Sequence, residues 1–136
     1  MPAVLVDAGP LIALIEPTDR HHRRAVATLK TLRGPLVTVW PAFTEAMYLL
    51  RDSARSQEAL WGIVSSGALD FAALGSGDVP RLSALMRHYR DQPMDLADAA
   101  LVHVAEREGI AHVFTFDRRH FAVYRLHGRR AFAVLP

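Results

Sequence analysis

The hydrophobic and polar positions of this chain predict short strands that alternate with helices from one end to the other. Continuous apolar runs, which are typical of buried parallel strands, cover residues 3–6, 36–40, 69–74 and 113–116, and a candidate closing edge strand covers 131–135. Apolar residues at helical spacing predict helices over 10–15, 21–32, 41–51, 57–64, 78–89 and 95–108. This alternation is typical of an α/β fold, in which helices cover both faces of a mostly parallel sheet of four or five strands.

Proline and glycine residues mark where several of these elements begin and end. Pro10 and Pro41 stand in the first turns of predicted helices, where the fixed φ of proline fits and its missing N–H is not needed. Gly109 follows the last long helix and predicts a C-terminal cap. No repeat or linker interrupts the pattern, and 136 residues fit one domain, so we expect a single domain over residues 1–136.

The composition excludes several classes of protein. The chain has no cysteine, which excludes a disulfide framework and a zinc site built on thiolates. No apolar run approaches the roughly 20 residues of a membrane span, and no basic leader precedes the first strand, so we expect a cytoplasmic protein with no membrane partner. The net charge is only +2. Lys30 is the sole lysine among 16 basic residues, but the codon preference of a GC-rich genome explains this arginine richness at least as well as phosphate binding does.

Two of the predicted strands are followed by an aspartate. Asp7 comes directly after the first apolar run, and Asp117 comes directly after the run over 113–116. Either residue could simply cap the helix or turn that follows it. In open α/β sheets, however, ligands bind outside the carboxyl ends of the strands, so acids at two such ends could face one shared cleft.

Three further acids lie on predicted helices. The i, i+3 spacing puts Asp95 and Asp98 on neighbouring positions of a first helical turn, where negative charge is favoured and Asp95 could be the N-cap. Alanine and leucine surround Asp98, which predicts a largely buried helix where an unpaired carboxylate is unfavourable. Glu45 lies in helix 41–51, and by itself it is typical of an exposed helix position.

Carboxylates from two strand ends and two helices would form an acidic site if the fold brought them together. Crowded carboxylates repel one another, so their pKa values rise unless a cation is bound. Oxygen ligands of this kind suit Mg²⁺ or Mn²⁺ rather than zinc, and such a site can activate a water against a phosphate. The seven histidines show no HExxH motif or similar spacing, so a histidine zinc site is not expected.

The order of these motifs resembles the PIN-domain family. Val-Asp-Ala-Gly-Pro-Leu-Ile-Ala-Leu begins at Val6, Asp-Leu-Ala-Asp-Ala-Ala-Leu-Val begins at Asp95, and Thr-Phe-Asp-Arg-Arg-His-Phe begins at Thr115. More narrowly, the whole chain is similar to the VapC-type toxins of bacterial toxin–antitoxin pairs. The resemblance implies a single PIN domain with a three-layer α/β/α fold and the activity of a metal-dependent endoribonuclease, with Mg²⁺ as the metal and Mn²⁺ as the alternative.

Carried over position by position, the resemblance implies roles for individual residues. The catalytic acids would be Asp7, Glu45, Asp98 and Asp117. Three of them, Asp7, Asp98 and Asp117, would hold the metal. Thr115 matches a hydroxyl residue that could hydrogen-bond a carboxylate or a water, and Asp95 matches an extra acid found in a subset of relatives, with a supporting part. One departure is that Ala-Gly-Pro follows Asp7, where a Ser, Thr or Asn is common.

The resemblance also implies partners. RNA would be the substrate, a cognate antitoxin protein would restrain the toxin, and the chain would form a homodimer, for which the apolar helices within 43–64 are a candidate surface. The residues beside Asp117 that could contact RNA are Arg118, Arg119 and His120, although a solvated surface is an equally good interpretation of them.

Two other functions fit parts of the pattern. A non-catalytic PIN-like module could bind RNA or a protein, although it would have no need of all four acids. A phosphoryl-transfer enzyme on an α/β sheet is the other alternative, but its usual Asp-x-Asp after the first strand is missing, because Ala8 and Gly9 follow Asp7.

Overall fold

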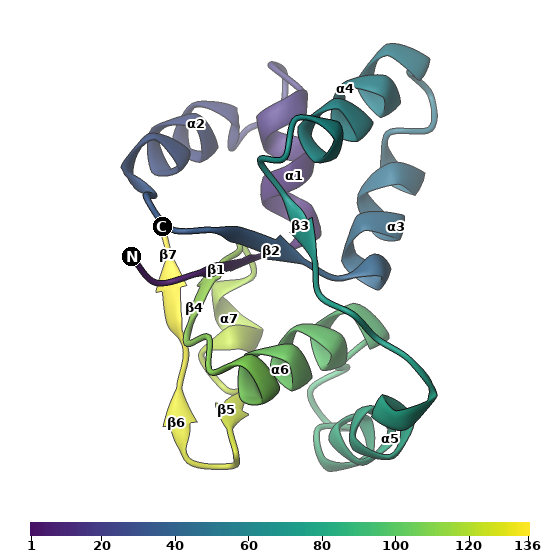
Figure 1. Cartoon of the computed structure of the whole chain (residues 1–136), viewed down its shortest axis with the longest axis vertical. Helices are drawn as coiled ribbons and strands as arrows, with labels where there is room; N and C mark the ends of the chain where they lie inside the picture. Colours follow the sequence, from purple (N-terminus) through teal and green to yellow (C-terminus); the bar gives the residue numbers. More distant parts are fainter.

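Five short parallel strands form the central sheet of this computed structural model, which describes all residues from 1 to 136. Their order across the sheet is β3-β2-β1-β4-β7 (Figure 1). The strands are β1 (Val4–Val6), β2 (Leu36–Thr38), β3 (Asp70–Phe71), β4 (His112–Phe114) and β7 (Ala133–Leu135). In the centre, Val4 pairs with Leu36 of β2 on one side and with His112 of β4 on the other.

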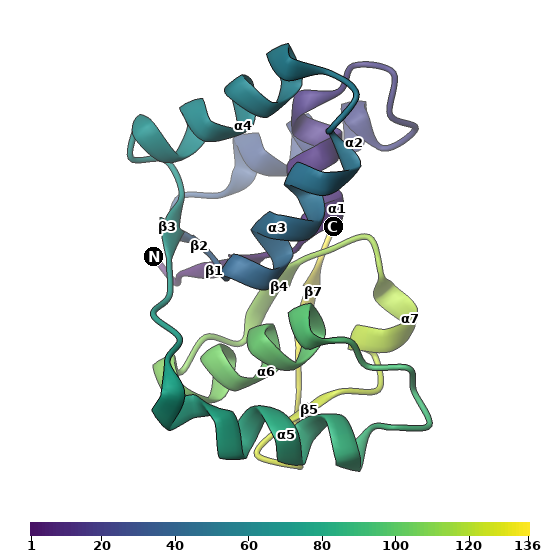
Figure 2. The ribbon, with the colours of Figure 1, turned by 90° about the vertical axis from the view of Figure 1, so that its right-hand side faces the viewer.

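Helices cover both faces of the sheet (Figures 1 and 2). One layer holds α1 (Ala8–Ile15), α2 (His22–Thr31), α3 (Trp40–Leu49) and α4 (Ala54–Ser65). The opposite layer holds the 3₁₀ turn η1 (Ser76–Asp78), α5 (Val79–His88), α6 (Leu96–Glu108) and α7 (Arg118–Phe121). None of these helices is long and apolar enough to cross a membrane. The arrangement confirms the predicted three-layer α/β/α fold.

The sheet separates two hydrophobic cores because successive side chains of a strand point to opposite faces. Val4 and Val6 pack into the core under α1, α3 and α4, whereas Leu5 between them packs into the core under α6 and α7. Phe114 and Val113 of β4 divide in the same way. All three residues of β1 are buried, which explains why the strand is a continuous apolar run.

The structure differs from the predicted elements mainly where helices and turns replace strand ends. The strand predicted over 36–40 stops at Thr38, because Val39 is the N-cap of α3 and Pro41 lies in the first turn. The strand predicted over 69–74 is only two residues long at the sheet edge. Ala131 belongs to an antiparallel hairpin, β5 (Arg125–Leu126) with β6 (Arg130–Ala131), and not to β7. The hairpin and α7 were not predicted.

Helix α6 matches its prediction closely, and its two caps explain why. The Asp95 carboxylate accepts a hydrogen bond from the Asp98 backbone N–H at 2.8 Å, which confirms Asp95 as the N-cap. Gly109 ends the helix with φ of 69°, a left-handed conformation that glycine adopts without strain. Most residues of α6 are buried, so the helix holds Asp98 in a fixed position against the sheet.

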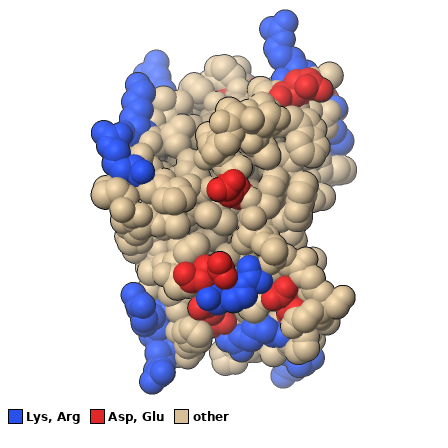
Figure 3. All heavy atoms as spheres, in the orientation of Figure 1, with Lys and Arg blue, Asp and Glu red and all other residues tan.

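Ion pairs join α6 to η1 and to α5. Asp78 of η1 accepts hydrogen bonds from Arg107 at 3.1 Å and pairs with His103 at 2.7 Å, and Arg81 pairs with Glu106 at 2.9 Å. His103 therefore contacts an acid rather than only packing on its helix. On the face drawn in Figure 3, acidic and basic side chains are interspersed in the lower half, where α5 and α6 lie, so this half of the face carries no field of one sign.

Candidate active site

The strand order reverses between β1 and β4, and this position determines where the site lies. The chain leaves β1 into α1 on one face of the sheet and leaves β4 toward α7 on the other face. Two adjacent parallel strands whose connections diverge leave a crevice at their carboxyl ends, which is the usual ligand site of an open α/β sheet. Asp7 follows β1, and the segment from Thr115 to Asp117 follows β4.

A cleft of about 330 Å³ lies at this end of the sheet. The predicted site residues that line it are Asp7, Glu45, Asp95, Asp98, Thr115, Asp117 and His120. The cleft thus brings together five carboxyl groups, and neither arginine nor lysine lines it. Arg118 and Arg119 are exposed and lie outside this lining, and Arg118 donates a hydrogen bond to the Pro136 carbonyl.

Thr115 connects the two acids that follow the central strands. Its buried hydroxyl donates a hydrogen bond to Asp7 Oδ2 at 2.8 Å and accepts one from the Asp117 backbone N–H at 3.0 Å. Asp7 Oδ1 accepts a second hydrogen bond, from the Ala8 backbone N–H at 2.8 Å. Asp7 is therefore both the N-cap of α1 and a carboxylate of the cleft. The Thr115 hydroxyl therefore fixes the carboxylate of Asp7 directly and fixes the backbone of Asp117.

Asp98 enters the cleft from α6 and is as buried as Asp7, with 8% of its surface exposed. Its Oδ2 accepts a hydrogen bond from the hydroxyl of Tyr124 at 2.8 Å. The Tyr124 ring is fully buried between the sheet and α6. Its aromatic neighbours include Tyr89 and Phe121, each with ring centroids 5.1 Å away.

Asp117 and His120 form a pair that also lines the cleft. The Asp117 carboxylate accepts hydrogen bonds from the backbone N–H of His120 at 3.3 Å and lies 2.8 Å from its Nδ1. The first contact makes Asp117 the N-cap of α7, and the second fixes the imidazole ring. With Nδ1 used in this way, Nε2 is the ring nitrogen left for another partner.

Glu45 reaches the rim of the cleft from α3. Among the four predicted catalytic acids, Glu45 is the most exposed. Partial burial of its carboxyl group still raises its pKa, and the negative charges of Asp7 and Asp95 raise the pKa further. The sequence alone could not separate Glu45 from an ordinary surface glutamate, whereas the structure places it among the other acids.

Three of the acids that line the cleft, Asp7, Glu45 and Asp98, have pKa values above those of isolated carboxyl groups. Burial raises the pKa of Asp98 to about 7, and the neighbouring Asp95 carboxylate adds to the effect, while the hydrogen bond from Tyr124 opposes it. Burial also raises the pKa of Asp7, against the hydrogen bonds from Thr115 and Ala8. A bound cation would remove this unfavourable crowding of negative charge.

The donor set fits a hard divalent cation. Five carboxyl groups and the Thr115 hydroxyl offer oxygen atoms, which suit Mg²⁺ or Mn²⁺, and His120 is the single residue of the lining that offers a side-chain nitrogen. No group of three or more acidic or histidine side chains forms a ready-made cage for an ion. Mg²⁺ commonly binds through one or two carboxylates and keeps several water ligands, so an open site of this kind fits it better than it fits zinc.

Sequence reasoning missed two features of the site. Tyr124 lies 26 positions from Asp98 along the chain, and no motif signals the contact. The ring of His21 stacks on Phe116, which lines the cleft, with centroids 4.2 Å apart. The contact places His21 beside a residue of the cleft, and Arg20, one of the arginines that the sequence offers for phosphate contact, hydrogen-bonds the His21 ring.

We expect the stability of the metal-free protein to fall as the pH rises from about 4 to about 7. The folded protein keeps a proton on Asp98 up to about pH 7, whereas the unfolded chain loses it near 3.8, the ordinary pKa of an aspartate. The resulting stabilisation is complete below the pKa that Asp98 has in the unfolded chain. It is lost as the pH rises through the pKa that Asp98 has in the folded protein. Thermal denaturation in EDTA across this range measures the loss, and in Asp98→Asn the slope should be smaller. Equal slopes in both proteins would contradict the prediction.

Comparison with known proteins agrees with this geometry. The PIN domain family model matches residues 4–126. Ribonuclease VapC26 of Mycobacterium tuberculosis (strain ATCC 25618 / H37Rv) is 27% identical over 135 residues, which cover 98% of this chain and 100% of the relative. The match therefore includes every residue that lines the cleft.

Two solved structures have a similar fold. The crystal structure of Mycobacterium tuberculosis VapC20, described as a Sarcin-Ricin loop cleaving toxin, superposes with a TM-score of 0.80 and 18% identity over 88% of this chain and 94% of that chain. A toxin–antitoxin complex from Klebsiella pneumoniae superposes with a TM-score of 0.67 and 19% identity over 88% and 90% of the two chains. The predicted resemblance to VapC-type proteins is confirmed, and the chain belongs to the PIN-domain family.

Proposed function

We propose that this protein is a Mg²⁺-dependent endoribonuclease that acts as the toxin of a toxin–antitoxin pair. The single observation that carries the enzymatic part is the cleft itself, where five carboxyl groups converge and no arginine or lysine is present to neutralise them. Membership of the PIN-domain family and the relative named as a ribonuclease support RNA as the substrate.

In the proposed reaction, the chain's own residues hold the cation and orient the substrate. Asp7, Asp98 and Asp117 would be the ligands, and when bound the cation supplies positive charge at the phosphate and lowers the pKa of a water. Glu45 at the rim can accept a proton, since its pKa is already raised. His120, held through Nδ1 by Asp117, can present Nε2 to a phosphate oxygen of the RNA.

The segment between α1 and α2 supports the proposed RNA path. The stacking of His21 on Phe116 holds this segment at the rim, and Arg20 hydrogen-bonds His21 at 3.2 Å. An arginine there can contact phosphates that leave the cleft without neutralising the acids inside it. Arg118 and Arg119, which follow Asp117 directly, remain candidates for the same role.

We expect EDTA to abolish RNA cleavage by the purified protein, and Mg²⁺ or Mn²⁺ to restore it. The acids repel one another in the free cleft, and only a cation lets all of them face an anionic phosphate. The measurement is cleavage of total RNA in EDTA and after addition of each metal, with Asp98→Asn as the control for a contaminating nuclease. Cleavage that persists in EDTA would contradict the proposal, and metal-dependent RNA binding without cleavage would favour the non-catalytic module.

The partner part of the proposal is an antitoxin protein and a second copy of the chain. The Klebsiella pneumoniae relative of known structure was solved as a toxin–antitoxin complex, which supports the first. Exposed apolar side chains on α3 and α4, Tyr48, Leu49 and Trp61, are of the kind that interfaces cover, which supports an interface on these helices.

Light scattering on the purified chain tests the dimer. Growth arrest on expression, relieved by the neighbouring reading frame, tests the toxin assignment.

A further inference from the structure

We infer that Tyr124 is a positioning residue of the metal site, because its buried hydroxyl fixes the carboxylate of Asp98 so that one oxygen stays available to a divalent cation. This inference rests on the proposed function, since it concerns how the proposed metal ligand is held. Tyr124 belongs to none of the motifs that carry the family resemblance, and it does not line the cleft itself.

The hydrogen bond gives the two carboxylate oxygens of Asp98 different surroundings. Oδ2 accepts from the Tyr124 hydroxyl at 2.8 Å, and no protein donor contacts Oδ1. Asp98 lines the cleft from the first turn of α6, so the oxygen without a protein donor is the one left for a ligand there. A carboxylate held by one oxygen cannot rotate freely, which lowers the entropy lost when the other oxygen binds a cation.

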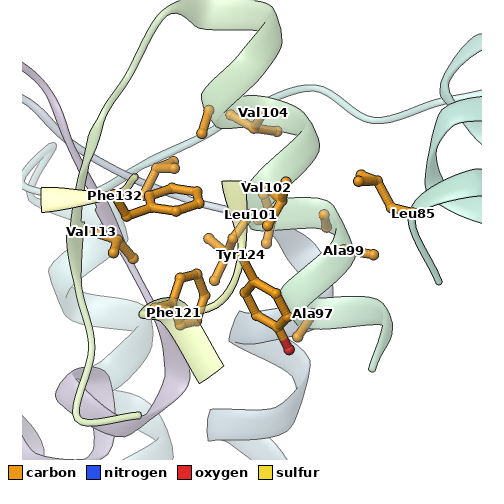
Figure 4. Packing of buried hydrophobic residues seen from close by; sticks show 14 of the residues in the cluster. Leu85, Ala97, Ala99, Leu101, Val102, Val104, Val113, Phe121, Tyr124 and Phe132 are labelled. Atoms are coloured by element: carbon orange, nitrogen blue, oxygen red, sulfur yellow. The ribbon is translucent and has the colours of Figure 1, made fainter. Parts of the chain in front are cut away.

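Tyr124 is placed with little freedom of its own. Its ring packs edge-on against Tyr89 at the end of α5 and against Phe121 of α7, and it lies nearly parallel to the imidazole of His120. Figure 4 shows the ring beside Phe121, with its hydroxyl oxygen next to Ala97 on α6, the residue that precedes Asp98. The packing of three helices thus determines where the hydroxyl points.

The hydroxyl donates its hydrogen to Asp98, so the phenol is a neutral partner of the carboxylate. A neutral donor of this kind orients the carboxylate without neutralising it, whereas an arginine or lysine at the same position would compete with the cation for the charge. Partners that hydrogen-bond a metal ligand in this way typically change metal affinity 10–100-fold when removed.

We expect Tyr124→Phe to weaken Mn²⁺ binding by about tenfold or more while the protein remains folded. Phenylalanine keeps the ring and its packing and removes only the hydroxyl. The measurement is isothermal titration calorimetry with Mn²⁺ and no RNA, together with thermal denaturation in EDTA. In cleavage assays the Mg²⁺ concentration for half-maximal rate should rise, whereas the rate at saturating Mg²⁺ should recover most of its wild-type value.

The matched control is Tyr89→Phe, which removes the hydroxyl of the neighbouring ring. Tyr89 accepts a hydrogen bond from the Arg125 backbone N–H at 3.0 Å and touches no carboxylate of the cleft. Its Mn²⁺ affinity should stay within about twofold of the wild type, because only an orienting partner of a ligand carries the larger effect. Equal Mn²⁺ affinity of Tyr124→Phe and the wild type would overturn the inference, and so would equal losses in both variants.

A measurement on the unaltered chain covers the case in which Tyr124→Phe does not fold. The chain has three tyrosines, so ¹³Cζ-tyrosine labelling gives three signals, which Tyr48→Phe and Tyr89→Phe assign by subtraction. Addition of Mg²⁺ should shift the Tyr124 signal and leave that of the exposed Tyr48 in place. Metal binding with no shift of the Tyr124 signal would overturn the inference about Tyr124 and leave the proposed metal site in place. A wild-type protein that binds neither metal would overturn the proposed metal site as well.

Discussion

Asp98→Asn is expected to lower metal-dependent RNA cleavage by more than about a hundredfold, because loss of a metal ligand should exceed the 10–100-fold cost of losing an outer partner. Asparagine has nearly the same shape, and its amide oxygen can still accept the hydrogen bond from Tyr124. The N-cap contact to Asp95 uses the backbone N–H of residue 98, so the substitution leaves it in place. What disappears is the negative charge that would bind the cation.

The same substitution should stabilise the metal-free fold at pH 8. The wild-type carboxyl, with its pKa raised to about 7, is mostly ionised there although it is buried, and the neutral amide avoids that cost. Cleavage rates and thermal denaturation in EDTA measure the two effects on one preparation. Asp52→Asn is the matched control, because Asp52 is exposed, does not line the cleft, and loses the same charge. Cleavage at the wild-type rate in Asp98→Asn would refute the assignment of the site.

Thr115→Val is expected to impair both stability and cleavage. Valine resembles threonine in shape but lacks the hydroxyl, so Asp7 Oδ2 loses a donor and the Asp117 N–H loses its acceptor. A buried polar group left without a partner costs about 1–3 kcal/mol in the free energy of unfolding. Cleavage should fall about 10–100-fold, as expected when a partner that orients metal ligands is removed.

Two other threonine substitutions separate the effects. Thr38→Val removes an equally buried hydroxyl, which donates to the Val6 carbonyl at 2.8 Å outside the cleft, so it should lower stability with little change in cleavage. Thr115→Ser keeps the hydroxyl and should retain most of the activity. Chemical denaturation and cleavage assays on the three variants give the comparison. If Thr38→Val and Thr115→Val lose the same activity, the loss reflects the fold and not the orientation of the acids.

Much of the site follows from local pattern and general topology. Asp7 and Asp117 stand directly after apolar runs, and parallel strands place their carboxyl ends at one edge, so their convergence could be predicted without coordinates. Asp98 could be predicted because its neighbours in α6 are small and apolar, which marks a buried helix. The same pattern predicted the helices, whose caps at Asp95 and Gly109 are local interactions between residues close in sequence.

Short elements with few apolar positions escaped prediction. Helix α7 is four residues long and begins from a cap made by Asp117, and the β5–β6 hairpin has strands of two residues each. Neither segment has a hydrophobic period long enough to recognise, and both are stabilised by packing against the rest of the domain. The edge strand β3 is shorter than the predicted strand over 69–74. An apolar run indicates which residues are buried, but it does not indicate how many of them pair with a neighbouring strand.

Local patterns along the chain were thus enough to predict the α/β class, the main elements of the sheet and its helices, and the acids that stand at strand ends or in the buried helix. The folded arrangement was needed to establish that Glu45 faces the other acids, that His120 pairs with Asp117, and that Tyr124 holds Asp98. The difference lies in the range of the interactions. Periodicity and capping act between near neighbours in the chain, whereas the direction of a single side chain depends on the packing of helices that are distant in sequence.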